Sequence, residues 1–400
     1  MLFICICSAL SIAVLETSLR LFAFLLQRKQ FGLRGAARPL RTISDSRLGH
    51  RPNPGYPGHD RNGFRNSRVP DEAFIVTLGD SQTYGNGVSL EENWPSRLKS
   101  MIHETVYNMA FGGYGPAHSL ILWDEAVALN PKFVLVEFYA GNDLFDSFDL
   151  AYNQGQLEDL KTSNSGQREI IKGLEASNPI SVEVNRTFRF GRRAGLIEPA
   201  DSGFISKYSK IYSLFMHARY ELSRRLRQRN RPEDEWELAM RIVEAHPKYF
   251  EVFIKGKFKT VFTSQYRLTA LNLDDPRIAE GLHISLEAFR RMSKLATSRS
   301  IRFMVVLIPS KEAVFRSLLS HPTTDYRNLQ KNEERLWRIT KHFLNQNGIP
   351  YLDALPALQE TFERGNQPYN ASTDGHLNKF GHQAIAELVA PNVKSQSKSQ

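Results

Sequence analysis

Cysteine is almost absent from the chain, and this excludes several kinds of site. The 400 residues contain two cysteines, Cys5 and Cys7, both in an apolar segment at the N-terminus. The rest of the chain therefore has no thiol for a disulfide, a zinc knuckle or a thiol nucleophile. The sequence also has no His-Glu-x-x-His motif or clustered ligand set, so we expect no metal and no other cofactor.

A strong excess of charge of one sign is also lacking. The chain has 52 Lys and Arg against 42 Asp and Glu, a formal charge of +10, with 41% hydrophobic and 24% charged residues. These values are typical of a globular protein and exclude a disordered chain, a collagen-like repeat and a polytopic membrane protein. No reader motif accompanies the positive charge, so we expect no nucleic-acid partner. The length suits one large domain with an insertion, or two domains.

One long apolar run is present, at the N-terminus. Residues 1–15 are apolar or small, and residues 21–26 continue the run after an interruption from Glu16 to Arg20. A membrane span needs about 20 mostly apolar residues, and Glu16 and Arg20 are spaced to pair on one helix face. No small-x-small cleavage site follows directly, so we predict a signal anchor, a single transmembrane helix, over residues 1–26. A cleaved signal peptide and an amphipathic or buried helix are the alternatives.

The charges around this run predict an orientation that other features oppose. Five cations follow the span and none precedes it: Arg28, Lys29, Arg34, Arg38 and Arg41. The positive-inside rule would then place the bulk of the chain in the cytoplasm. The family resemblance described below favours export instead, so both orientations stay open.

The remaining chain divides by composition. Residues 27–72 are rich in Arg, Gly and Pro and are predicted to be a linker and lead-in segment. Residues 73–150 and 280–392 show short apolar strands alternating with amphipathic helices, and residues 393–400 form a polar tail. The expected strands are 74–78, 105–109, 133–139, 301–308 and 350–352, and the expected helices 90–102, 118–129, 279–297, 328–345 and 379–389. This alternation predicts an α/β domain of three layers, a doubly wound parallel sheet with helices on both faces.

The segment between these two parts, residues 151–279, is predicted to be a basic, mostly helical insertion. Between Arg186 and Arg231 it has 12 Lys or Arg against three acids. Such a stretch is either a solvated helix end or a surface for acidic glycan or anionic lipid headgroups. Apolar residues at helical spacing, including Ile205, Tyr208 and Tyr212, favour core packing over a membrane or ligand face.

A serine follows the first predicted strand. Residues 74–78 lead directly into Gly79-Asp80-Ser81. A serine at the carboxyl end of a strand in a parallel sheet lies at the crevice where such folds bind ligands, and a following turn or helix start supplies N–H groups for an oxyanion. The pattern is not the Gly-x-Ser-x-Gly elbow, since Thr83 stands two residues after Ser81. We predict that Ser81 is a nucleophile.

Three further groups follow the ends of other predicted strands. Gly112-Gly113 comes after the second strand, Asn142-Asp143 after the third, and Asp374-Gly375-His376 after the last. Together with Ser81 they supply a nucleophile, a base, a residue that orients the base, and oxyanion donors, which is the set that acyl transfer needs.

Each of these residues also has a purely structural interpretation. Ser81 and Asp374 suit caps, Gly113 and Asn142 suit turns, and His376 suits a packed histidine. Three neighbours are assigned structural roles: Asp80 and Asp143 as turn carboxylates and His382 as a polar group at a helix start.

With these four blocks in this order, the chain resembles the SGNH (GDSL-type) hydrolase superfamily, over about residues 60–150 and 280–390. The resemblance implies the flavodoxin-like SGNH fold. It also implies that Ser81 is the nucleophile and that His376 is the general base, oriented by Asp374. The oxyanion hole would consist of the Ser81 and Gly113 N–H groups and the Asn142 amide.

The details of the blocks narrow the resemblance. Residues 60–65 and 308–311 look like the membrane-anchored branch found with exported polysaccharide. Ala140 stands where the family's Gly-x-Asn-Asp block has its first glycine. The spacing Asp374-x-His376 replaces the usual Asp-x-x-His and is similar to the acetyltransferases of exported alginate rather than to simple lipolytic members.

The expected function is therefore a membrane-anchored serine esterase or O-acyltransferase with an extracytoplasmic catalytic domain. It would remove or transfer acetyl groups on exported or cell-envelope polysaccharide, with an acylated glycan or another small acyl ester as substrate. In the expected mechanism His376 takes the Ser81 proton as the hydroxyl attacks the acyl carbonyl. The alternative is a non-catalytic envelope protein that binds polysaccharide or acts as a scaffold on the same fold.

Overall fold

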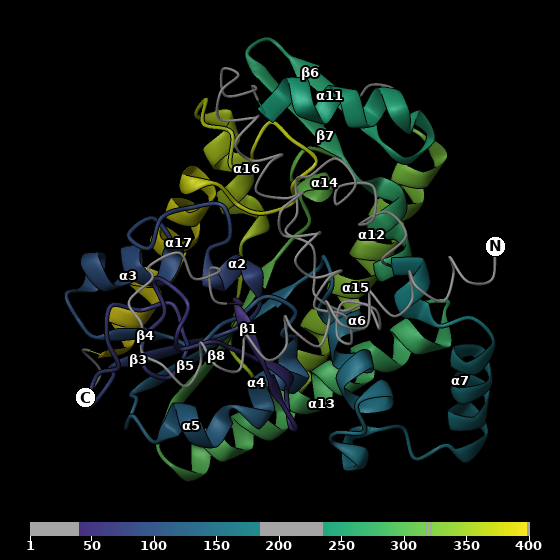
Figure 1. Ribbon diagram of the computed structural model, residues 1–400. Coiled ribbons are helices and arrows are strands. Elements are labelled where there is room, and N and C mark those ends of the chain that lie inside the picture. The colour runs from purple at the N-terminus through teal and green to yellow at the C-terminus, as the bar shows by residue number, and fades with distance from the viewer. Residues whose placement is uncertain (1–39, 185–234, 317–318, 320–321, 398–400) are drawn as a thin grey trace, which may run out of the picture. The chain divides into compact units, whose positions relative to one another are not determined.

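The computed structural model describes residues 40–184, 235–316, 319 and 322–397 (Figure 1). The predicted anchor and the basic stretch with its apolar stripe lie outside these residues. Within the described residues, no helix is both long and apolar enough to cross a membrane. Contacts divide the chain into two units, Met1–Arg38 with Gly191–Leu238 and Pro39–Phe190 with Ala239–Gln400. Everything below concerns the second unit, apart from the first turn of one helix.

A parallel sheet forms the centre of this unit. Its strands lie in the order β4 (Val106–Asn108), β3 (Ile75–Leu78), β5 (Phe133–Tyr139), β8 (Arg302–Ile308) and β9 (Tyr351–Asp353). Every neighbouring pair is parallel. Counted along the chain, this order is 2-1-3-4-5, the flavodoxin-like doubly wound arrangement. The prediction of an α/β fold with a parallel sheet is confirmed, and the strand order places the switch point between β3 and β5.

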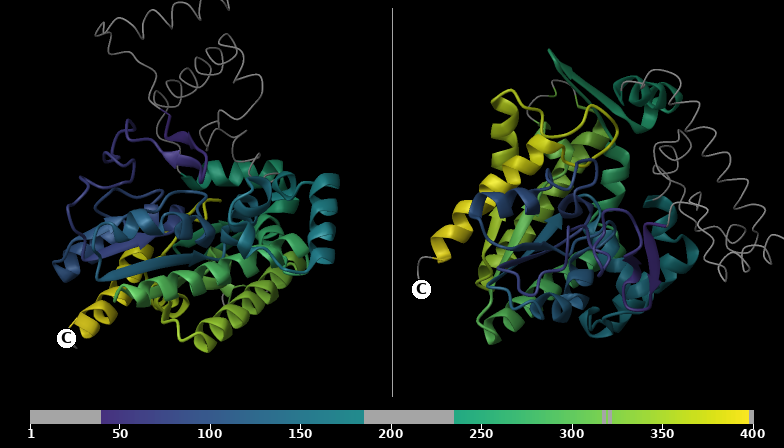
Figure 2. Two further views of the ribbon diagram at one scale, coloured as in Figure 1. Left: turned by 90° about the horizontal axis from the view of Figure 1, so that it is seen from below. Right: turned by 60° about the vertical axis from the view of Figure 1, so that its left-hand side comes forward.

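Helices cover both faces of the sheet, which gives three layers (Figures 1 and 2). Alternate residues of β5 belong to separate apolar clusters: Val134 and Val136 to one, Phe133 and Leu135 to the other. The first cluster includes residues of α4 (Pro116–Ile121), α5 (Trp123–Val127), α6 (Asp143–Phe148), α13 (Pro276–Ser298) and α15 (Thr324–Gln346). The second includes residues of α3 (Trp94–Ile102), α14 (Lys311–Val314), α16 (Leu355–Glu363) and α17 (Lys379–Ser397). Burial on both faces explains why β5 and β8 are almost continuously apolar.

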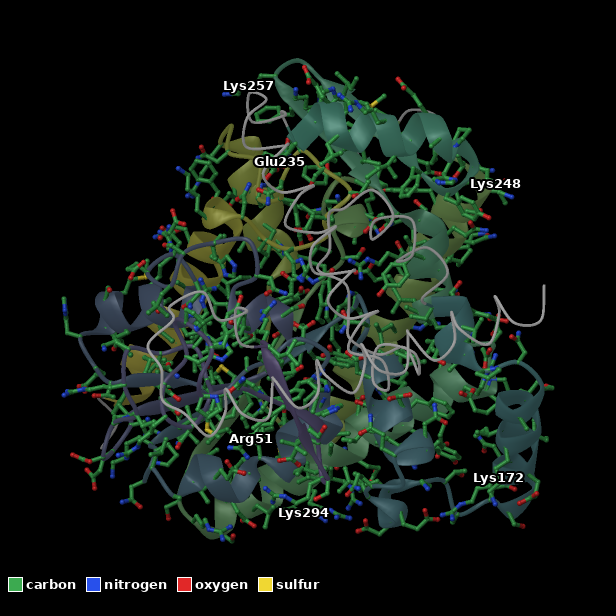
Figure 3. All side chains as sticks on the ribbon, in the orientation of Figure 1. Arg51, Lys172, Glu235, Lys248, Lys257 and Lys294 are labelled. Carbon is green, nitrogen blue, oxygen red and sulfur yellow. The ribbon has the colours of Figure 1, made fainter. Side chains whose placement is uncertain are left out.

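The lead-in segment contains an ordered hairpin where we expected a linker. β1 (Thr42–Asp45) and β2 (Gly49–Pro52) pair antiparallel. Arg51 of β2, labelled in Figure 3, donates to Glu125 of α5 from both terminal nitrogens, one of them at 2.9 Å. Since an arginine that binds both carboxylate oxygens has a fixed geometry, this pair anchors the hairpin to the α/β body. Lys172 and Lys294, by contrast, point outward (Figure 3).

The described part of the insertion is mostly helical, as predicted, and also contains a hairpin that the prediction did not include. It begins with η1 (Asp149–Asn153), η2 (Glu158–Leu160) and α7 (Ser165–Ser177), and resumes with α11 (Glu235–Ala245), η3 (Pro247–Tyr249) and α12 (Ser264–Ala270). Between η3 and α12 lies an antiparallel hairpin of β6 (Glu251–Lys255) and β7 (Phe258–Phe262). Its turn contains Gly256 at φ +59°, in the left-handed region that glycine adopts without strain. The mostly helical prediction missed this hairpin.

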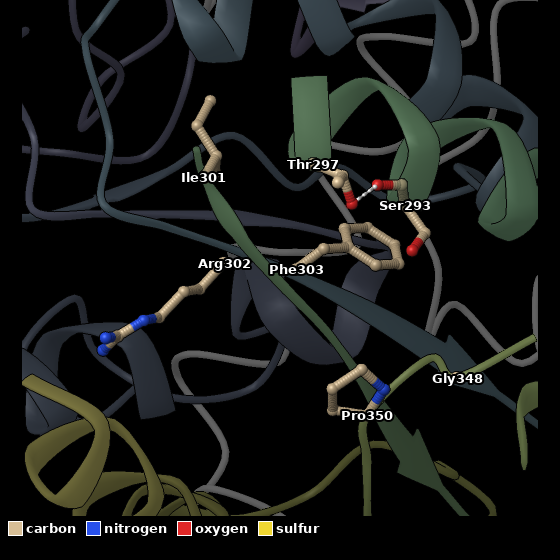
Figure 4. Close-up of a pocket in the computed structure, with 7 residues that line it drawn as sticks. All are labelled: Ser293, Thr297, Ile301, Arg302, Phe303, Gly348 and Pro350. Atoms are coloured by element: carbon tan, nitrogen blue, oxygen red, sulfur yellow. Dashed lines mark hydrogen bonds between the residues drawn. The ribbon is translucent and has the colours of Figure 1, made fainter. Parts of the chain in front are cut away.

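One cavity of about 310 Å³ lies at the edge of the sheet where β8 begins (Figure 4). It is lined by Ser293, Thr297, Ile301, Arg302, Phe303, Gly348 and Pro350. In doubly wound folds the ligand crevice is at the carboxyl ends of the strands. This cavity is at the opposite end, away from the serine and the other predicted site residues.

Candidate active site

Ser81 is the first residue of α2 (Ser81–Tyr84), the short helix that directly follows β3. The Asp80 carboxylate caps the helix by accepting from the Gln82 N–H at 2.6 Å. Before it, Gly79 has φ +153°, and a Cβ on this residue would lie 2.4 Å from Oε2 of the buried Glu137. Gly79 thus permits the close turn that leaves Ser81 at the carboxyl end of β3, 8% exposed.

The structure brings Ser81, His376 and Asp374 together. His376 Nε2 lies 2.9 Å from Ser81 Oγ, and His376 Nδ1 lies 2.5 Å from Asp374 Oδ1. The same Oδ1 accepts the backbone N–H of His376 at 3.0 Å. A carboxylate can only accept, so Nδ1 carries the ring proton and Nε2 is free to accept from the serine hydroxyl. The two-residue spacing lets one carboxylate oxygen bind both the backbone and the ring of the histidine.

The charges of this pair act on each other. Burial lowers the pKa of His376, but the charge and hydrogen bond of Asp374 outweigh burial and raise it above the ordinary histidine value. Burial raises the pKa of Asp374, but the charge and hydrogen bonds of His376, with the charge of Lys311, outweigh burial and lower it. Asp374 is therefore ionised, and it stabilises the protonated imidazole that a general base becomes.

Three side chains hold the loop that carries this pair. Gln82 donates to the Gly375 carbonyl at 3.1 Å and accepts from the Leu377 N–H at 3.0 Å. The Tyr139 hydroxyl donates to the same Gly375 carbonyl at 3.2 Å. The buried Lys311 ammonium donates to the carbonyls of Val261, Ser372 and Asp374 at 2.7, 2.9 and 3.0 Å. The loop is thus tied to α2, to β5 and to the insertion.

Two of the three predicted oxyanion donors have no acceptor in the part of the chain that the structure describes. No hydrogen bond joins the Ser81 or Gly113 backbone N–H to any described residue. His50 of the lead-in hairpin lies 3.0 Å from the Gly112 carbonyl, and burial lowers its pKa, so Nε2 of the neutral ring donates to this carbonyl. Because the peptide bond is trans, the Gly113 N–H points in the direction opposite to the Gly112 carbonyl, away from His50. A Cβ on Gly112 would lie 3.6 Å from Ser81 Cβ, so this backbone lies next to the serine.

Asn142, the third predicted donor, is placed beside Ser81 but is already bonded. Its amide nitrogen donates to Asp80 Oδ2 at 3.3 Å and to Asp146 Oδ2. Ser81 Oγ also lies 3.1 Å from Asp80 Oδ2. Asp80, which we assigned to a turn, therefore contacts both the serine and the amide. Asp143 accepts the Tyr139 N–H at 2.9 Å, as a turn carboxylate does.

The carboxyl groups around β5 resist ionisation. Burial, followed by the charge of Asp80, raises the pKa of Glu137 and of Asp143 well above the ordinary value. Burial also raises the pKa of Asp146 to about 8, although the hydrogen bond from Asn142 opposes this. Burial thus favours the uncharged form of each of these carboxyls.

Arg267 of α12 is a buried cation next to Gly141 and Gly375, in the loops that carry Asn142 and His376. Its Nη1 would lie 2.4 Å from a Cβ on Gly141, and its Nη2 would lie 2.1 Å from a Cβ on Gly375. The guanidinium lies over the rings of Tyr139 and Tyr266, at 5.3 and 5.0 Å from their centroids. No hydrogen bond or ion pair joins its side chain to the residues that the structure describes. Gly141 and Gly375, at the x positions of the Gly-x-Asn-Asp and Asp-x-His blocks, thus leave space for the Arg267 side chain.

Sequence reasoning missed several of these contributors. Glu137 had a signal, since it is the only charged residue in a strand of seven. Arg267 had none, because its position depends on contacts with distant segments, and Asp146, four residues after Asn142, was not recognised as the partner of that amide. His382, assigned a structural role, is buried and accepts from the Trp94 N–H at 3.2 Å. Within the described residues, no group of three or more His, Cys, Asp or Glu side chains has the arrangement of a metal site.

Comparisons with known proteins give solved structures only. No family model and no curated protein matches the chain. An acetylxylan esterase from Geobacillus stearothermophilus, a catalytic mutant, is 8% identical with a TM-score of 0.37, over 81% of this chain and 95% of that one. A GDSL-like lipase from Bacteroides thetaiotaomicron is 9% identical with a TM-score of 0.33, over 80% and 88%. The structural neighbours include GDSL-type hydrolases, the superfamily whose four sequence blocks this chain resembles.

Proposed function

We propose that the protein is a serine esterase or O-acyltransferase that forms an acyl-enzyme on Ser81. The observation that carries the proposal is the continuous chain from Ser81 Oγ through both nitrogens of His376 to Asp374, at 2.9 and 2.5 Å. The N–H groups of Ser81 and Gly113, which have no acceptor among the described residues, support an oxyanion hole beside it.

In the proposed mechanism His376 Nε2 accepts the Ser81 proton as Oγ attacks the acyl carbonyl. The carbonyl oxygen becomes negative and accepts from the Ser81 and Gly113 N–H groups, with Asn142 as the third donor if it leaves one of its carboxylates. The tetrahedral species then collapses: the bond to the alcohol oxygen breaks, and the proton on Nε2 passes to that oxygen. Water or a hydroxyl group repeats these steps in reverse and releases the acyl group.

The finer parts of the proposal are the acyl group, the acceptor and the location. Acetyl as the acyl group, and exported or cell-envelope polysaccharide as its carrier, are supported by the resemblance of residues 60–65 and 308–311 and by the Asp374-x-His376 spacing. A periplasmic or other extracytoplasmic site is supported by the same resemblance and by the apolar residues 1–26 as a single-pass anchor. The positive-inside rule opposes that orientation.

The test uses the full-length protein with p-nitrophenyl acetate, with and without an oligosaccharide acceptor. Release of p-nitrophenol should depend on Ser81, and Ser81→Ala should lower it at least about 1000-fold, to the level left by binding alone. Acetylated sugar as product would identify a transferase. Absence of Ser81-dependent release, together with no labelling by a fluorophosphonate, would contradict the proposal and favour a polysaccharide-binding or scaffolding protein.

A further inference from the structure

A second amide, absent from our predicted site, lies beside the catalytic histidine. Asn86 follows α2, and its Nδ2 lies 3.4 Å from His376 Nε2. The same nitrogen would lie 4.0 Å from a Cβ on Gly112, a position that is itself 3.6 Å from Ser81 Cβ. The Asn86 backbone N–H donates to the Ser81 carbonyl at 3.0 Å, which fixes its distance from the serine. Asn86 therefore borders the space between nucleophile and base.

Arg41 determines which end of this amide faces His376. Its Nη2 donates to Asn86 Oδ1 at 2.5 Å. A guanidinium has five donors and no acceptor, so the atom it binds must be the amide oxygen. The other end, the NH₂ group, must then point toward Nε2 of His376. The orientation of this side chain thus follows from chemistry and does not depend on distinguishing oxygen from nitrogen by shape.

Arg41 is itself held in place by aromatic rings. Its guanidinium carbon lies 4.4 Å from the centroid of Tyr84 and 5.3 Å from that of Phe111. Stacking of this kind orients the planar guanidinium. Arg41 immediately precedes β1, so the lead-in hairpin supplies one contact to the active site through Arg41 and another through His50.

The Asn86 amide is placed to contact the alcohol oxygen of the ester. The alcohol oxygen of the ester must lie within hydrogen-bond distance of His376 Nε2, because that nitrogen returns the proton to it. An oxygen there also lies within reach of Asn86 Nδ2. Asn142 differs, since its amide is bonded to Asp80 and Asp146.

We propose that Asn86 is a catalytic residue that donates a hydrogen bond to the alcohol oxygen, and that Arg41 is the residue that positions it. The inference rests on the proposed acyl-enzyme function. As the bond between the acyl carbon and the oxygen breaks, its electron pair moves to the oxygen and the proton on Nε2 follows. The Asn86 N–H keeps its own proton and stabilises the negative charge that precedes proton transfer. In the reverse step it orients the attacking hydroxyl or water.

The test compares acetyl esters whose leaving alcohols differ in pKa, using full-length protein and kcat/KM, which reports acylation. A hydrogen bond to the leaving oxygen matters most where that oxygen carries most charge. Asn86→Ala should lower kcat/KM less than about 3-fold for p-nitrophenyl acetate and about 30- to 100-fold for an alkyl acetate. Asn142→Ala, on the carbonyl side, should lower both to a similar extent.

Arg41 provides the matched pair of variants. Arg41→Met frees the amide to turn and should reproduce the steeper dependence on leaving-group pKa, whereas Arg41→Lys keeps a donor for Oδ1 and should restore most of the alkyl acetate activity. If Arg41 had only a structural role, both Arg41 variants would lower kcat/KM for all esters to the same extent. Thermal unfolding of each variant identifies one that fails to fold.

The outcomes separate the inference from the proposed function. Equal losses for all esters in Asn86→Ala, or no loss for the alkyl acetate, would overturn the role of Asn86 while Ser81-dependent turnover stands. Lack of Ser81-dependent turnover in the unmodified protein would overturn the proposed function, and the role of Asn86 with it.

Discussion

At the scale of single residues, the closeness of Asp374 and His376 along the chain decides how the base behaves. Asp374 Oδ1 binds both the ring Nδ1 and the backbone N–H of His376. The base can therefore change neither its tautomer nor its orientation without breaking a charge-assisted bond. Such bonds are about twice as strong as neutral ones.

The raised pKa of His376 predicts the pH dependence of turnover. The base must be neutral to accept the Ser81 proton, so kcat/KM should rise with pH through a pKa above the ordinary histidine value of about 6.5. Asp374→Asn removes the charge that raises this pKa. The variant should lose about 10⁴-fold in kcat. Its residual activity should still increase with pH, but the midpoint of that increase should lie at a lower pH than in the unmodified protein.

A pH–rate profile of an acetyl ester between pH 5 and 9, with the protein and the variant measured side by side, checks both expectations. Asp353→Asn is a suitable control, since the Asp353 carboxylate binds Lys341, at 2.6 Å, and the Leu355 N–H, and neither residue belongs to the loop that carries Asp374 and His376. A variant profile that coincides with that of the unmodified protein would argue against the assignment of His376 as base.

At the scale of elements, Lys311 joins segments that are far apart in the sequence. It begins α14, is fully buried, and donates to carbonyls of β7 and of the catalytic loop. Burial lowers its pKa to about 8, against the opposing charges of Glu312 and Asp374. The Lys311 ammonium thus binds both the insertion, through β7, and the loop that carries Asp374 and His376.

Lys311→Met should therefore destabilise the protein and impair the site together. The substitution removes the ammonium from which three carbonyls accept, that of the buried Val261 and those of the half-buried Ser372 and Asp374, and an unsatisfied buried group costs about 1 to 3 kcal/mol. We expect a loss of at least about 2 kcal/mol in the free energy of unfolding and a marked fall in kcat. Denaturant unfolding and esterase assays measure the two effects.

Lys294→Met is the control for the lost charge, since Lys294 points outward from α13 (Figure 3). Unchanged stability in Lys311→Met would mean that water or another donor replaces the ammonium. In that case the lysine would not be what ties the insertion to the loop.

At the scale of the whole molecule, buried acids make stability depend on pH. Burial raises the pKa of Glu333 to about 7 and of Asp146 to about 8, and raises those of Glu137 and Asp143 well above the ordinary value. The folded state therefore binds more protons than the unfolded state once the pH exceeds ordinary carboxyl pKa values. Stability falls with rising pH wherever this holds.

Buried bases oppose this carboxyl term: His118 and His382 do so mainly below about pH 7.5, and Lys311 does so as the pH approaches 8. Burial lowers the pKa of His118 and His382 to about 3, so both are neutral in the folded state, whereas in the unfolded state they are half protonated at about pH 6.5 and lose their protons only by about pH 7.5. Each carboxyl with a raised pKa should lower the free energy of unfolding by up to about 1.4 kcal/mol per pH unit in this range, so the melting temperature should fall more steeply with pH in the unmodified protein than in a variant that lacks one of these carboxyls.

Asp146→Asn should flatten this fall, because the amide cannot ionise. Scanning calorimetry at several pH values measures the slope, and Asp159→Asn, a substitution at an exposed acid, is the comparison. Equal slopes in all three proteins would contradict the assignment of Asp146.

The sequence predicted most of the sheet because its strands are buried on both faces. The range 133–139 coincides with β5, and the other four expected strands lie within one or two residues of the observed ones. Ser81 was predicted as a site residue because it directly follows a strand at the carboxyl edge of the sheet, whereas Asp374 and His376, which α16 separates from β9, were predicted from the order of the sequence blocks. Asn86, Arg41 and Arg267 were not, because their contacts join the lead-in and the insertion to the sheet, and no local pattern encodes such pairing.

The arginine between the two catalytic loops links positions that look independent in the sequence. Gly141 and Gly375 are the variable residues of separate blocks, 234 positions apart, yet the guanidinium of Arg267 occupies the space that a side chain on either would need. A larger residue at either glycine is acceptable only when Arg267 is replaced by a residue with a shorter side chain. That replacement alone leaves a void next to both glycines. The three positions thus form one unit of variation, and changing the insertion alters which residues the oxyanion and base loops can accept.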